Sequence, residues 1–404
     1  MQRRRESEHP VATRLDDFSY LAPGAHYFDA ACQSLRPQPV LDALSEYYTE
    51  YNACGGRVKY AWGRRVDDAV QATRGAVLGL LGLSARNHAV SFTLNTTYGL
   101  NLLLSQLPLD TYDRVVTSHT EHNSVLLPTM TAARRLGVER VALGRTPDGA
   151  LDYEPAQLAR AVVVVGAVSN VDGSSLANLR ELVRDTHEWG GIVIVDAAQA
   201  MAHHRDLLSK TEADAICFSA HKMYGASLGV VIARHDLLTS LDVTFIGGGM
   251  VTDVRDDSFD LATHDPASLL EPGLQAWGEI VALGAAISWL GRVRPGGRSP
   301  AEHMSTLSTR LHDGLAAIPR LRLLNLSASA VISVHAPGVD SHRLAVFLGK
   351  SGVMARSGYF CAHHHLKQRL GLPPLLRFSV GLHNTVDDVD IAVERLQSLV
   401  SGLR

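Results

Sequence analysis

Short apolar runs alternate with stretches of helical periodicity along the first three quarters of the chain. The apolar runs are rich in β-branched residues and mostly lack polar alternation, which is typical of strands buried on both faces. They lie at 113–119, 139–144, 161–170, 191–199, 215–222 and 229–234, and helical patterns lie between them at 123–136 and 176–189. This alternation predicts an α/β fold with a mostly parallel sheet covered by helices, with functional groups at the strand ends.

The pattern changes after about residue 290. The segment "RVRPGGRSP" at 292–300 interrupts it with Pro and Gly, and "SPAEH" after it is a helix start. Two strands at 330–335 and 375–383 follow, and then a last helix with Thr385 as its N-cap. We predict an N-terminal segment over 1–30 that packs beside one of the domains, a large domain over 31–290, and a smaller α+β domain over 295–404.

Composition excludes several classes of protein. The 404 residues are 46% hydrophobic, which is ample for a core, and the net charge of −3 gives no reason to expect a nucleic acid or membrane partner. The four cysteines are far apart and form no CxxC pair, which argues against a disulfide framework or a zinc knuckle. No signal peptide or bilayer-spanning run is recognisable. We therefore expect a soluble, cytoplasmic protein.

The segment "FSAHKMYG" places Lys222 directly after an apolar strand. Burying an ammonium group is costly, and a desolvated lysine has a lowered pKa that suits Schiff-base formation. Taken alone, a lysine that extends its ammonium group from a strand end into water is the commoner explanation.

A second segment, "GGIVIVDAAQA", places Asp196 at the end of a strongly apolar strand, with Gln199 shortly after it. A carboxylate there requires a cationic or hydrogen-bonding partner, and the pyridinium nitrogen of pyridoxal 5'-phosphate (PLP) is one. One strand–loop–strand unit separates Asp196 from Lys222, so both strand ends can face one cavity.

Other segments supply candidate groups for the same cofactor. Thr96, Thr97 and Gly99 stand where a helix begins, which suits a phosphate, although an ordinary Thr N-cap is more frequent. Ser219 and His221 offer further donors. His122 follows another strand and can stack on the pyridine ring, although a structural histidine is the commoner case.

The segment "RSGYFCAHHHLKQRLG" at 356–371 holds Cys361 and three consecutive histidines. It can be a metal site, a loop with a nucleophilic thiol, or a polar loop around a buried sulfur. Successive side chains of an extended chain point to opposite faces, so His363, His364 and His365 cannot easily bind one ion. We expect no metal, and a solvated polar loop that becomes ordered on binding.

The segments "NTTYGLN", "TEHNSVLLP", "VSNVDGS", "VDAAQA", "FSAHKMYG", "FIGGGM" and "RSGYFCA" together resemble the class V aminotransferase family of fold-type I PLP enzymes. The nearest branch resembles the Suf-type cysteine desulfurases and selenocysteine lyases, and the likeness covers about 27–400. It implies a large domain with a mostly parallel seven-stranded sheet, a smaller C-terminal domain, PLP as cofactor, and a homodimer with the sites at the subunit interface.

The resemblance also implies roles for individual residues. Lys222 corresponds to the lysine that forms the aldimine, Asp196 to the partner of the pyridine nitrogen, and Gln199 to the donor to O3'. The other correspondences are His122 (ring stacking), Asn170 (near O3' and the substrate carboxylate), Thr96, Thr97, Ser219 and His221 (phosphate), Arg377 (substrate α-carboxylate), Arg356 (substrate side) and Cys361 (the thiol that takes the sulfur). Arg356 and His363 are candidates for stabilising the Cys361 thiolate.

Three segments depart from the family pattern. Trp277 stands where a desulfurase usually has a threonine that reaches the partner subunit's phosphate. "YNACGGRVKYAWG" lacks the usual His-Arg-Gly, so Arg57, Lys59 and Tyr60 can make different substrate contacts. Tyr359 and Phe360 replace polar residues next to Cys361.

Three functions follow. The main prediction is a cysteine desulfurase-like enzyme that cleaves a C–S bond of an amino-acid substrate and forms a persulfide on Cys361, with a sulfur-acceptor protein as a possible partner. The first alternative is another PLP reaction, a C–S lyase, epimerase or aminotransferase, that does not need Cys361. The second is a non-catalytic sulfur carrier or scaffold, which the combination of Lys222, Asp196, His122 and Arg377 disfavours.

Overall fold

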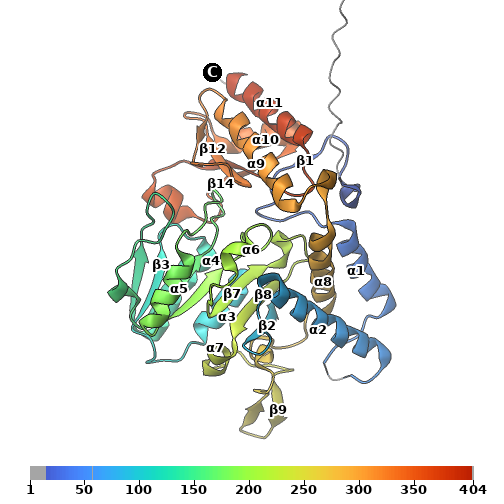
Figure 1. The fold of residues 1–404 in the computed structure, drawn as a ribbon, viewed down its shortest axis with the longest axis vertical. Helices are drawn as coiled ribbons and strands as arrows, with labels where there is room; N and C mark the ends of the chain where they lie inside the picture. The colour runs from blue at the N-terminus through green and yellow to red at the C-terminus, as the bar shows by residue number, and fades with distance from the viewer. Residues whose placement is uncertain (1–14, 57, 403–404) are drawn as a thin grey trace, which may run out of the picture.

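A seven-stranded sheet forms the centre of the computed structural model, which describes residues 15–56 and 58–402 (Figure 1). Its strands, in spatial order, are β2 (His88–Thr93), β8 (Gly229–Arg234), β7 (Ala215–Ser219), β6 (Ile192–Asp196), β5 (Ala161–Gly166), β3 (Arg114–Ser118) and β4 (Glu139–Leu143). Strand β8 runs antiparallel to both of its neighbours, and the pairs from β7 to β4 are parallel. The predicted mostly parallel sheet is confirmed.

Both faces of this sheet are buried, because successive side chains of a strand point to opposite faces. In β5, Val163 and Val165 belong to one apolar cluster, whereas Val162 and Val164 belong to another. The first cluster includes α2 (Ala61–Leu81), α5 (Leu179–Glu188) and α8 (Trp277–Arg292), and the second includes α3 (Thr96–Ser105), α4 (Asn123–Leu136) and α7 (His235–Ser240). Strand β2, which the sequence pattern missed, lies at the sheet edge and pairs with β8.

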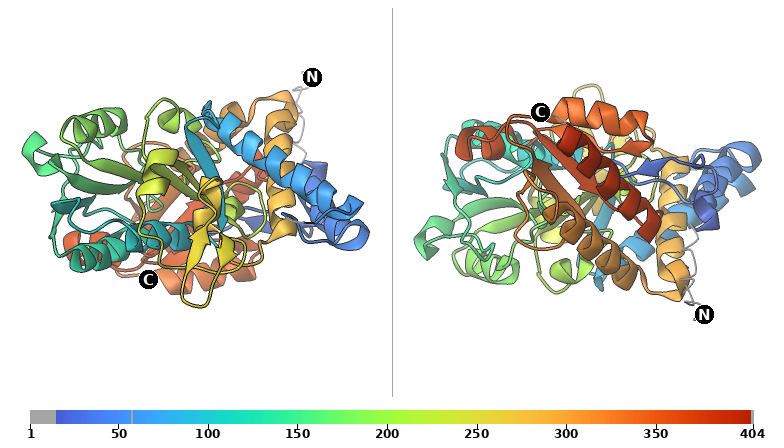
Figure 2. Two further views of the ribbon diagram at one scale, coloured as in Figure 1. Left: turned by 90° about the horizontal axis from the view of Figure 1, so that it is seen from below. Right: turned by 90° about the horizontal axis from the view of Figure 1, so that it is seen from above.

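A second, antiparallel sheet lies in the C-terminal part. Its strands are β11 (Arg322–Leu323), β12 (Val331–His335), β15 (Leu375–Ser379) and β14 (Arg356–Gly358), accompanied by α9 (Pro300–Ala316), α10 (Ser341–Lys350) and α11 (Val386–Gly402). Two predicted helix starts are confirmed: Ser299 and Glu302 form a capping box at α9, and Thr385 Oγ1 accepts from the backbone N of Asp388 at α11. Figures 1 and 2 show these helices and strands stacked over one end of the large sheet.

The N-terminal segment joins the two parts. Strand β1 (His26–Tyr27) pairs with β13 (Val353–Met354) of the C-terminal part, and α1 (Gln38–Glu50) packs against α8. The ring of Phe18 packs edge-on against Trp289. The described part of this segment thus packs on other parts of the chain, and residues 1–14 lie outside the described residues.

Short elements complete the chain. They are η1 (Asp16–Phe18), η2 (Pro155–Leu158), α6 (Arg205–Leu208), η3 (Ala220–Lys222), β9 (Val251–Val254), β10 (Phe259–Leu261), η4 (Pro266–Leu270), η5 (Pro295–Gly297) and the π-helix η6 (His364–Arg369). Strands β9 and β10 form a hairpin that projects from the body of the protein (Figure 1).

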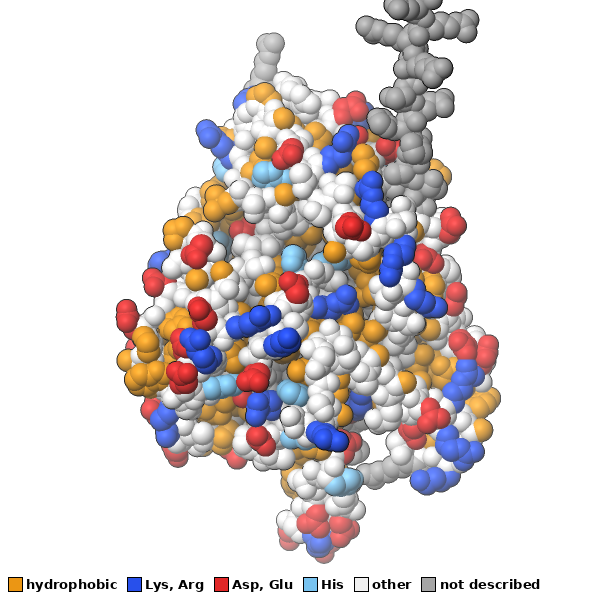
Figure 3. Space-filling view, viewed as in Figure 1, with side chains coloured by type: hydrophobic (Ala, Val, Ile, Leu, Met, Phe, Trp, Pro, Cys, Tyr) orange, Lys and Arg blue, Asp and Glu red, His pale blue; other side chains and the backbone are white. Residues whose placement is uncertain are grey.

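Acidic and basic side chains are interspersed over the face of the molecule that Figure 3 shows. Within 15–56 and 58–402, no helix has the length and apolar character needed to cross a membrane.

Candidate active site

A cavity of about 220 Å³ opens at the carboxyl ends of the parallel strands. Functional groups gather there in parallel sheets, because the loops that follow the strands all begin at the same edge of the sheet. The residues that line it are Asn95, Thr96, Thr97, Thr120, Glu121, His122, Ser124, Arg145, Gly166, Val168, Ser169, Asn170, Asp196, Ala198, Gln199, Ser219, His221 and Lys222. All nine cofactor residues predicted from the sequence are thus brought together.

Lys222 is the last residue of η3, which follows β7 directly. Burial lowers the pKa of its amine, and the charge of Arg377 acts in the same direction, whereas the Asp196 carboxylate opposes both. A lysine in such surroundings has a larger fraction of free amine and is a better nucleophile than one in water.

Asp196 ends β6 and is only 8% exposed. Burial raises the pKa of its carboxyl group, while a hydrogen bond from Ala198 N (2.9 Å) and the charge of Lys222 lower it. A buried carboxylate that faces a cavity requires a protonated or cationic partner there. A protonated pyridine nitrogen satisfies this requirement, so this side of the cavity fits PLP.

Hydroxyl groups surround the start of α3, on another wall of the cavity. Asn95 caps the helix by accepting from Tyr98 N (2.9 Å), so neither threonine is the N-cap. Ser219 Oγ accepts from Thr96 N (3.0 Å) and lies 2.6 Å from Thr96 Oγ1, and Thr97 Oγ1 lies 2.6 Å from Ser124 Oγ. A helix N-terminus with such donors fits the phosphate group of PLP.

His122 is the N-cap of α4, and its Nδ1 accepts from Ser124 N at 3.0 Å. Burial, together with the charges of Lys222 and Arg377, lowers the pKa of His122 to about 4. The pKa of His221 is also lowered to about 4, mainly by burial. Both imidazoles are therefore neutral at pH 7. Gln199 Nε2 donates to the carbonyl of Ala31 (2.7 Å), which ties the N-terminal segment to the cavity.

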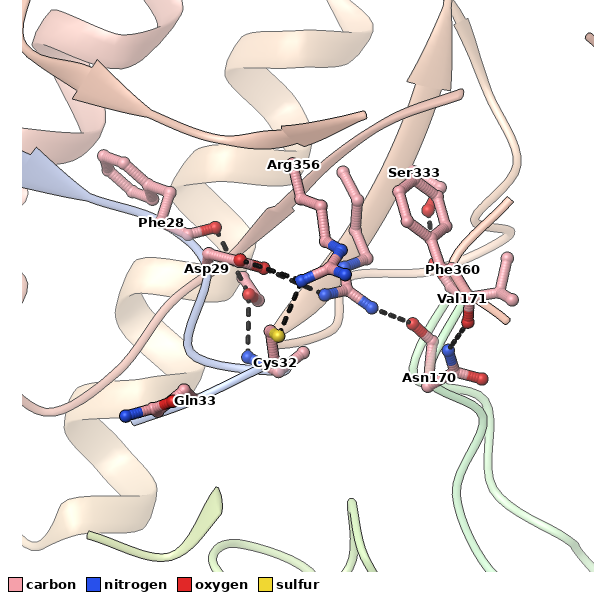
Figure 4. Close-up of polar contacts among 12 residues, drawn as sticks. Phe28, Asp29, Cys32, Gln33, Asn170, Val171, Ser333, Arg356 and Phe360 are labelled. Carbon is pink, nitrogen blue, oxygen red and sulfur yellow. Dashed lines mark hydrogen bonds and ion pairs between the residues drawn. The ribbon is translucent and has the colours of Figure 1, made fainter. Parts of the chain in front are cut away.

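Arg377 lies on β15 and is 2% exposed. Its Nη1 donates to the carbonyl of Asn170 and its Nη2 to Asp29 Oδ1, both at 2.9 Å. The guanidinium also lies 4.8 Å from the ring centre of Phe360. Asn170 in turn donates from Nδ2 to the carbonyl of Phe360 (2.6 Å), so Asn170 links Arg377 to the loop of Cys361 (Figure 4).

Cys361 is exposed, and its loop has an unusual backbone. Phe360 and Cys361 have φ angles of 48° and 57°, in the left-handed region that non-glycine residues rarely adopt. Asn123 N donates to the Cys361 carbonyl (2.7 Å), and the Asn170 amide holds the carbonyl before it. Strain of this kind persists only where surrounding contacts hold it, and it is frequent at functional sites.

Arg356 is within electrostatic reach of Cys361, but its guanidinium is in direct contact with a second cysteine. Arg356 Nη1 lies 2.6 Å from the sulfur of Cys32 and 3.5 Å from Asp29 Oδ2. His363 is exposed, and its ring packs against Tyr359.

The expected solvated loop is wrong for the next two histidines. His364 and His365 begin the π-helix η6 and are half-buried, and His119 Nδ1 lies 3.3 Å from His364 Nε2. The reason is local packing: Phe360, Ala362 and Leu366 form a small apolar cluster with Val171, which orders this segment. In the described part of the chain, no group of three or more His, Cys, Asp or Glu side chains could hold a metal ion.

The residues that depart from the family pattern and are described by the structure do not line the cavity. Trp277 is the first residue of α8, and its indole nitrogen is buried without a hydrogen-bond partner among the described residues. Lys59 and Tyr60 are exposed and do not line the cavity. Arg57 lies outside the described residues.

Sequence reasoning missed two pairs of residues at the site. Glu121 is 3% exposed, accepts from Gly166 N (2.8 Å) and lies 3.5 Å from Arg145 Nη2. Its position directly before His122 was an available signal. Asp29 and Cys32 had no such signal, because their partners are more than 300 positions away.

Comparisons with known proteins agree with this site. The model of the family described as aminotransferase class-V matches residues 26–392. A probable cysteine desulfurase of Pseudomonas aeruginosa is 34% identical, covering 95% of this chain and 96% of that protein. The apo structure of a cysteine desulfurase from Thermococcus onnurineus has a TM-score of 0.85 at 28% identity, covering 94% of this chain and 95% of that one. The cysteine desulfurase CsdA of Escherichia coli, solved with an S-sulfonic acid, has a TM-score of 0.84 at 25% identity, covering 96% and 99%.

These matches extend over nearly the whole chain and include both sheets. They agree with the predicted fold class and with the predicted cofactor, for which the cavity supplies an amine, a buried carboxylate and a helix N-terminus. The chain therefore belongs to the class V aminotransferase family of fold-type I, PLP-dependent enzymes.

Proposed function

We propose that this chain is a PLP-dependent cysteine desulfurase that releases alanine from cysteine and takes the sulfur onto Cys361. One observation carries the proposal: the desolvated Lys222 interacts with Asp196 in a cavity whose residues also hold the loop of an exposed thiol. That thiol belongs to Cys361, and its loop accepts hydrogen bonds from Asn170 and from the first residue of α4. The names of the relatives, cysteine desulfurases over more than nine tenths of the chain, support it.

Lys222, Asp196 and the hydroxyls around the start of α3 would hold the cofactor. Once bound, PLP supplies an electron sink for the carbon from which a proton is removed. Gln199 and His122 both line the cavity and would orient the ring, with His122 neutral at pH 7.

The chain's own residues divide the remaining work. Arg377 binds the substrate α-carboxylate, since its planar guanidinium can donate two parallel hydrogen bonds to the two carboxylate oxygens. The free amine of Lys222 takes the Cα proton. The Cys361 thiolate then attacks the substrate sulfur, the new S–S bond forms as the substrate C–S bond breaks, and the carbon keeps that electron pair and is protonated. Alanine leaves, and Cys361 holds a persulfide.

The proposal includes a homodimer and a protein that accepts the sulfur. Exposed apolar side chains support a subunit contact: Phe245 is 52%, Ile246 38% and Leu274 78% exposed. A backbone hydrogen bond from Gly273 to Gly248 (2.8 Å) joins the two segments that carry them. A reducing compartment such as the cytoplasm suits the four free thiols.

The test is product formation from cysteine by the PLP-loaded protein. With an excess of a thiol reductant to reduce the persulfide, we expect alanine and sulfide from the wild type and from Cys54→Ser, which removes an exposed thiol that does not line the cavity. Lys222→Ala should lose both the activity and the borohydride-reducible band. Cys361→Ala should lose alanine formation from cysteine while keeping that band. Equal activity of Cys361→Ala on cysteine or on a thioether would instead indicate a C–S lyase.

A further inference from the structure

A second cysteine lies next to the arginine that sequence reasoning assigned to Cys361. Arg356 Nη1 is 2.6 Å from the sulfur of Cys32, which is half-buried in the turn that follows Asp29 (Figure 4). The backbone N of Cys32 donates to the Asp29 carbonyl (3.0 Å), which fixes this turn. Partly exposed cysteines beside a guanidinium are the kind that react in proteins.

Cys32 and Cys361 both interact electrostatically with Arg356 and with Lys222. Arg356 stands five positions before Cys361, on the short strand β14 that leads into the Cys361 loop. Burial is the largest single influence on the pKa of Arg356, and it lowers that pKa. The negative charges of Cys32, Asp29 and Cys361 act in the opposite direction and together outweigh burial, so the pKa is raised. The pKa of Lys222, lowered mainly by burial, is also raised in part by both thiols. Both sulfurs are therefore within electrostatic reach of the same amine and the same guanidinium.

A chain of hydrogen bonds joins the turn of Cys32 to the loop of Cys361. Asp29 Oδ1 accepts from Arg377 Nη2, and Arg377 Nη1 donates to the Asn170 carbonyl (both 2.9 Å). The Asn170 amide then donates to the carbonyl of Phe360, the residue before Cys361 (2.6 Å). The second guanidinium, that of Arg356, bonds the Cys32 turn directly. Two segments more than 300 positions apart are thus held in a fixed relation.

We propose that Cys32 is a second sulfur-carrying thiol of this site, which accepts the outer sulfur from a persulfide on Cys361. The Cys32 thiolate attacks the outer sulfur, a new S–S bond forms, and the bond between that sulfur and Cys361 breaks. Cys361 leaves as a thiolate, and the outer sulfur keeps its proton. The exchange is a thiol–persulfide analogue of thiol–disulfide exchange, so no oxidant or reductant is consumed.

The consequence is that one subunit can hold sulfur on Cys32 while Cys361 is free for another turnover. Because the half-buried Cys32 is less accessible than the exposed Cys361, its persulfide is better protected from solvent. The inference rests on the proposed function, since Cys361 must first receive sulfur from the substrate.

The main test maps persulfides after one equivalent of cysteine is added to the PLP-loaded protein, by alkylation and peptide mass analysis. The label counted here is the persulfide sulfur on each cysteine. We expect label on both Cys361 and Cys32 in the wild type, with at least about a tenth of the total on Cys32, since exchange between similar thiols is near balance. Cys361→Ser should lose label at both positions, and Cys32→Ser should keep it on Cys361 alone. Cys54→Ser is the matched control and should behave as the wild type.

Label on Cys361 alone in the wild type would overturn the inference and leave the proposed function intact. If the Cys361→Ser variant carried as much label on Cys32 as the wild type does, the inference would also be overturned, because Cys32 would then take sulfur without Cys361. Absence of both alanine and label would overturn the proposed function and this inference together.

A second measurement uses the cofactor-free protein and does not depend on turnover. Dibromobimane, a short reagent that becomes fluorescent when it joins two thiols, should link the Cys32 and Cys361 peptides. The link should persist in Cys54→Ser and disappear in Cys32→Ser and in Cys361→Ser. A wild type in which these two peptides are never linked would show that the thiols are too far apart to exchange sulfur.

Discussion

Arg377, which is buried, and Asp29, which is half-buried, form an ion pair with Nη2 and Oδ1 2.9 Å apart, although 348 positions separate them in the chain. The guanidinium that the family resemblance assigns to the substrate carboxylate thus already has a carboxylate partner. On the proposed function, a substrate must share Arg377 with Asp29 or displace Asp29, so we expect this pair to influence how strongly the site binds an anionic amino acid.

Asp29→Asn should tighten the binding of α-amino acids, because it keeps a polar group of the same shape and removes the competing negative charge. We expect about a fivefold lower Kd, which corresponds to ~1 kcal/mol. Spectral titration of the PLP-loaded protein with alanine measures this.

The matched control is Asp390→Asn, since Asp390 forms an exposed pair with Arg310 away from the cavity. Its Kd should equal that of the wild type. Unchanged or weaker binding in Asp29→Asn would mean that Asp29 orients Arg377 for the substrate rather than competing with it.

Asp196→Asn should reduce kcat on the order of 100-fold or more, because the neutral amide cannot hold a proton on the ring nitrogen as a carboxylate does. Bound PLP, measured by absorbance after gel filtration, should remain, since Lys222 and the hydroxyls at α3 are intact.

Asp214→Asn is the control for loss of a buried carboxylate. Asp214 is also 8% exposed, but it bonds His187 and the backbone of Val193 at the other end of the sheet. It should lower thermal stability with kcat nearly unchanged. A similar loss of kcat in both variants would show that the effect of Asp196 is only structural.

Acid should destabilise the protein through its buried histidines. Burial lowers the pKa of His203 to about 3, helped by His204 and Arg205. The folded pKa lies below the unfolded value, so the unfolded chain binds the proton first and stability is lost as pH falls from about 6.5 toward 3. At pH 5 this histidine alone costs about 2 kcal/mol relative to pH 8.

His203→Gln removes the titration while keeping an acceptor for the hydroxyl of Tyr224, which lies 3.3 Å from His203 Nε2. Its Tm should fall less than that of the wild type between pH 7 and pH 5, as followed by circular dichroism. His122 and His221 remain in this variant and titrate in the same direction, so a smaller slope is expected rather than none. Identical pH profiles would contradict the assignment.

Gly99→Ala should disturb the start of α3, where hydroxyls line the cavity. A Cβ at Gly99 would lie 2.6 Å from Val231 Cγ2, so the helix must move away from the sheet. We expect a loss of about 1–3 kcal/mol in unfolding free energy and weaker PLP binding.

Gly75→Ala, in the interior of α2, provides the opposite control. A Cβ there meets nothing within 4 Å, so the variant should gain about 0.5–1 kcal/mol from helix propensity. Urea unfolding of the two variants gives the comparison. A stable Gly99→Ala with wild-type PLP affinity would show that α3 is not held by this contact.

Local sequence patterns were enough to locate most of the large sheet. Lys222 and Asp196 follow apolar strands that the pattern placed within a few residues of β7 and β6, and both side chains line one cavity because parallel strands end at the same edge. Strand β2 was missed, because only its pairing with β8 distinguishes it from other short apolar stretches. The π-helix after Cys361 was missed as well, since its order comes from packing against Val171.

The sequence by itself determined most strands of the large sheet, the position of Lys222 after one of them and the residues next to it in each motif, because these depend on contacts among near neighbours in the chain. Only the tertiary structure decided that Cys32 and Asp29 lie against Arg356 and Arg377. That juxtaposition depends on how the N-terminal segment crosses to the C-terminal sheet, through the pairing of β1 with β13. No local periodicity encodes it, because the contact energy is gained only once both sheets have folded and met.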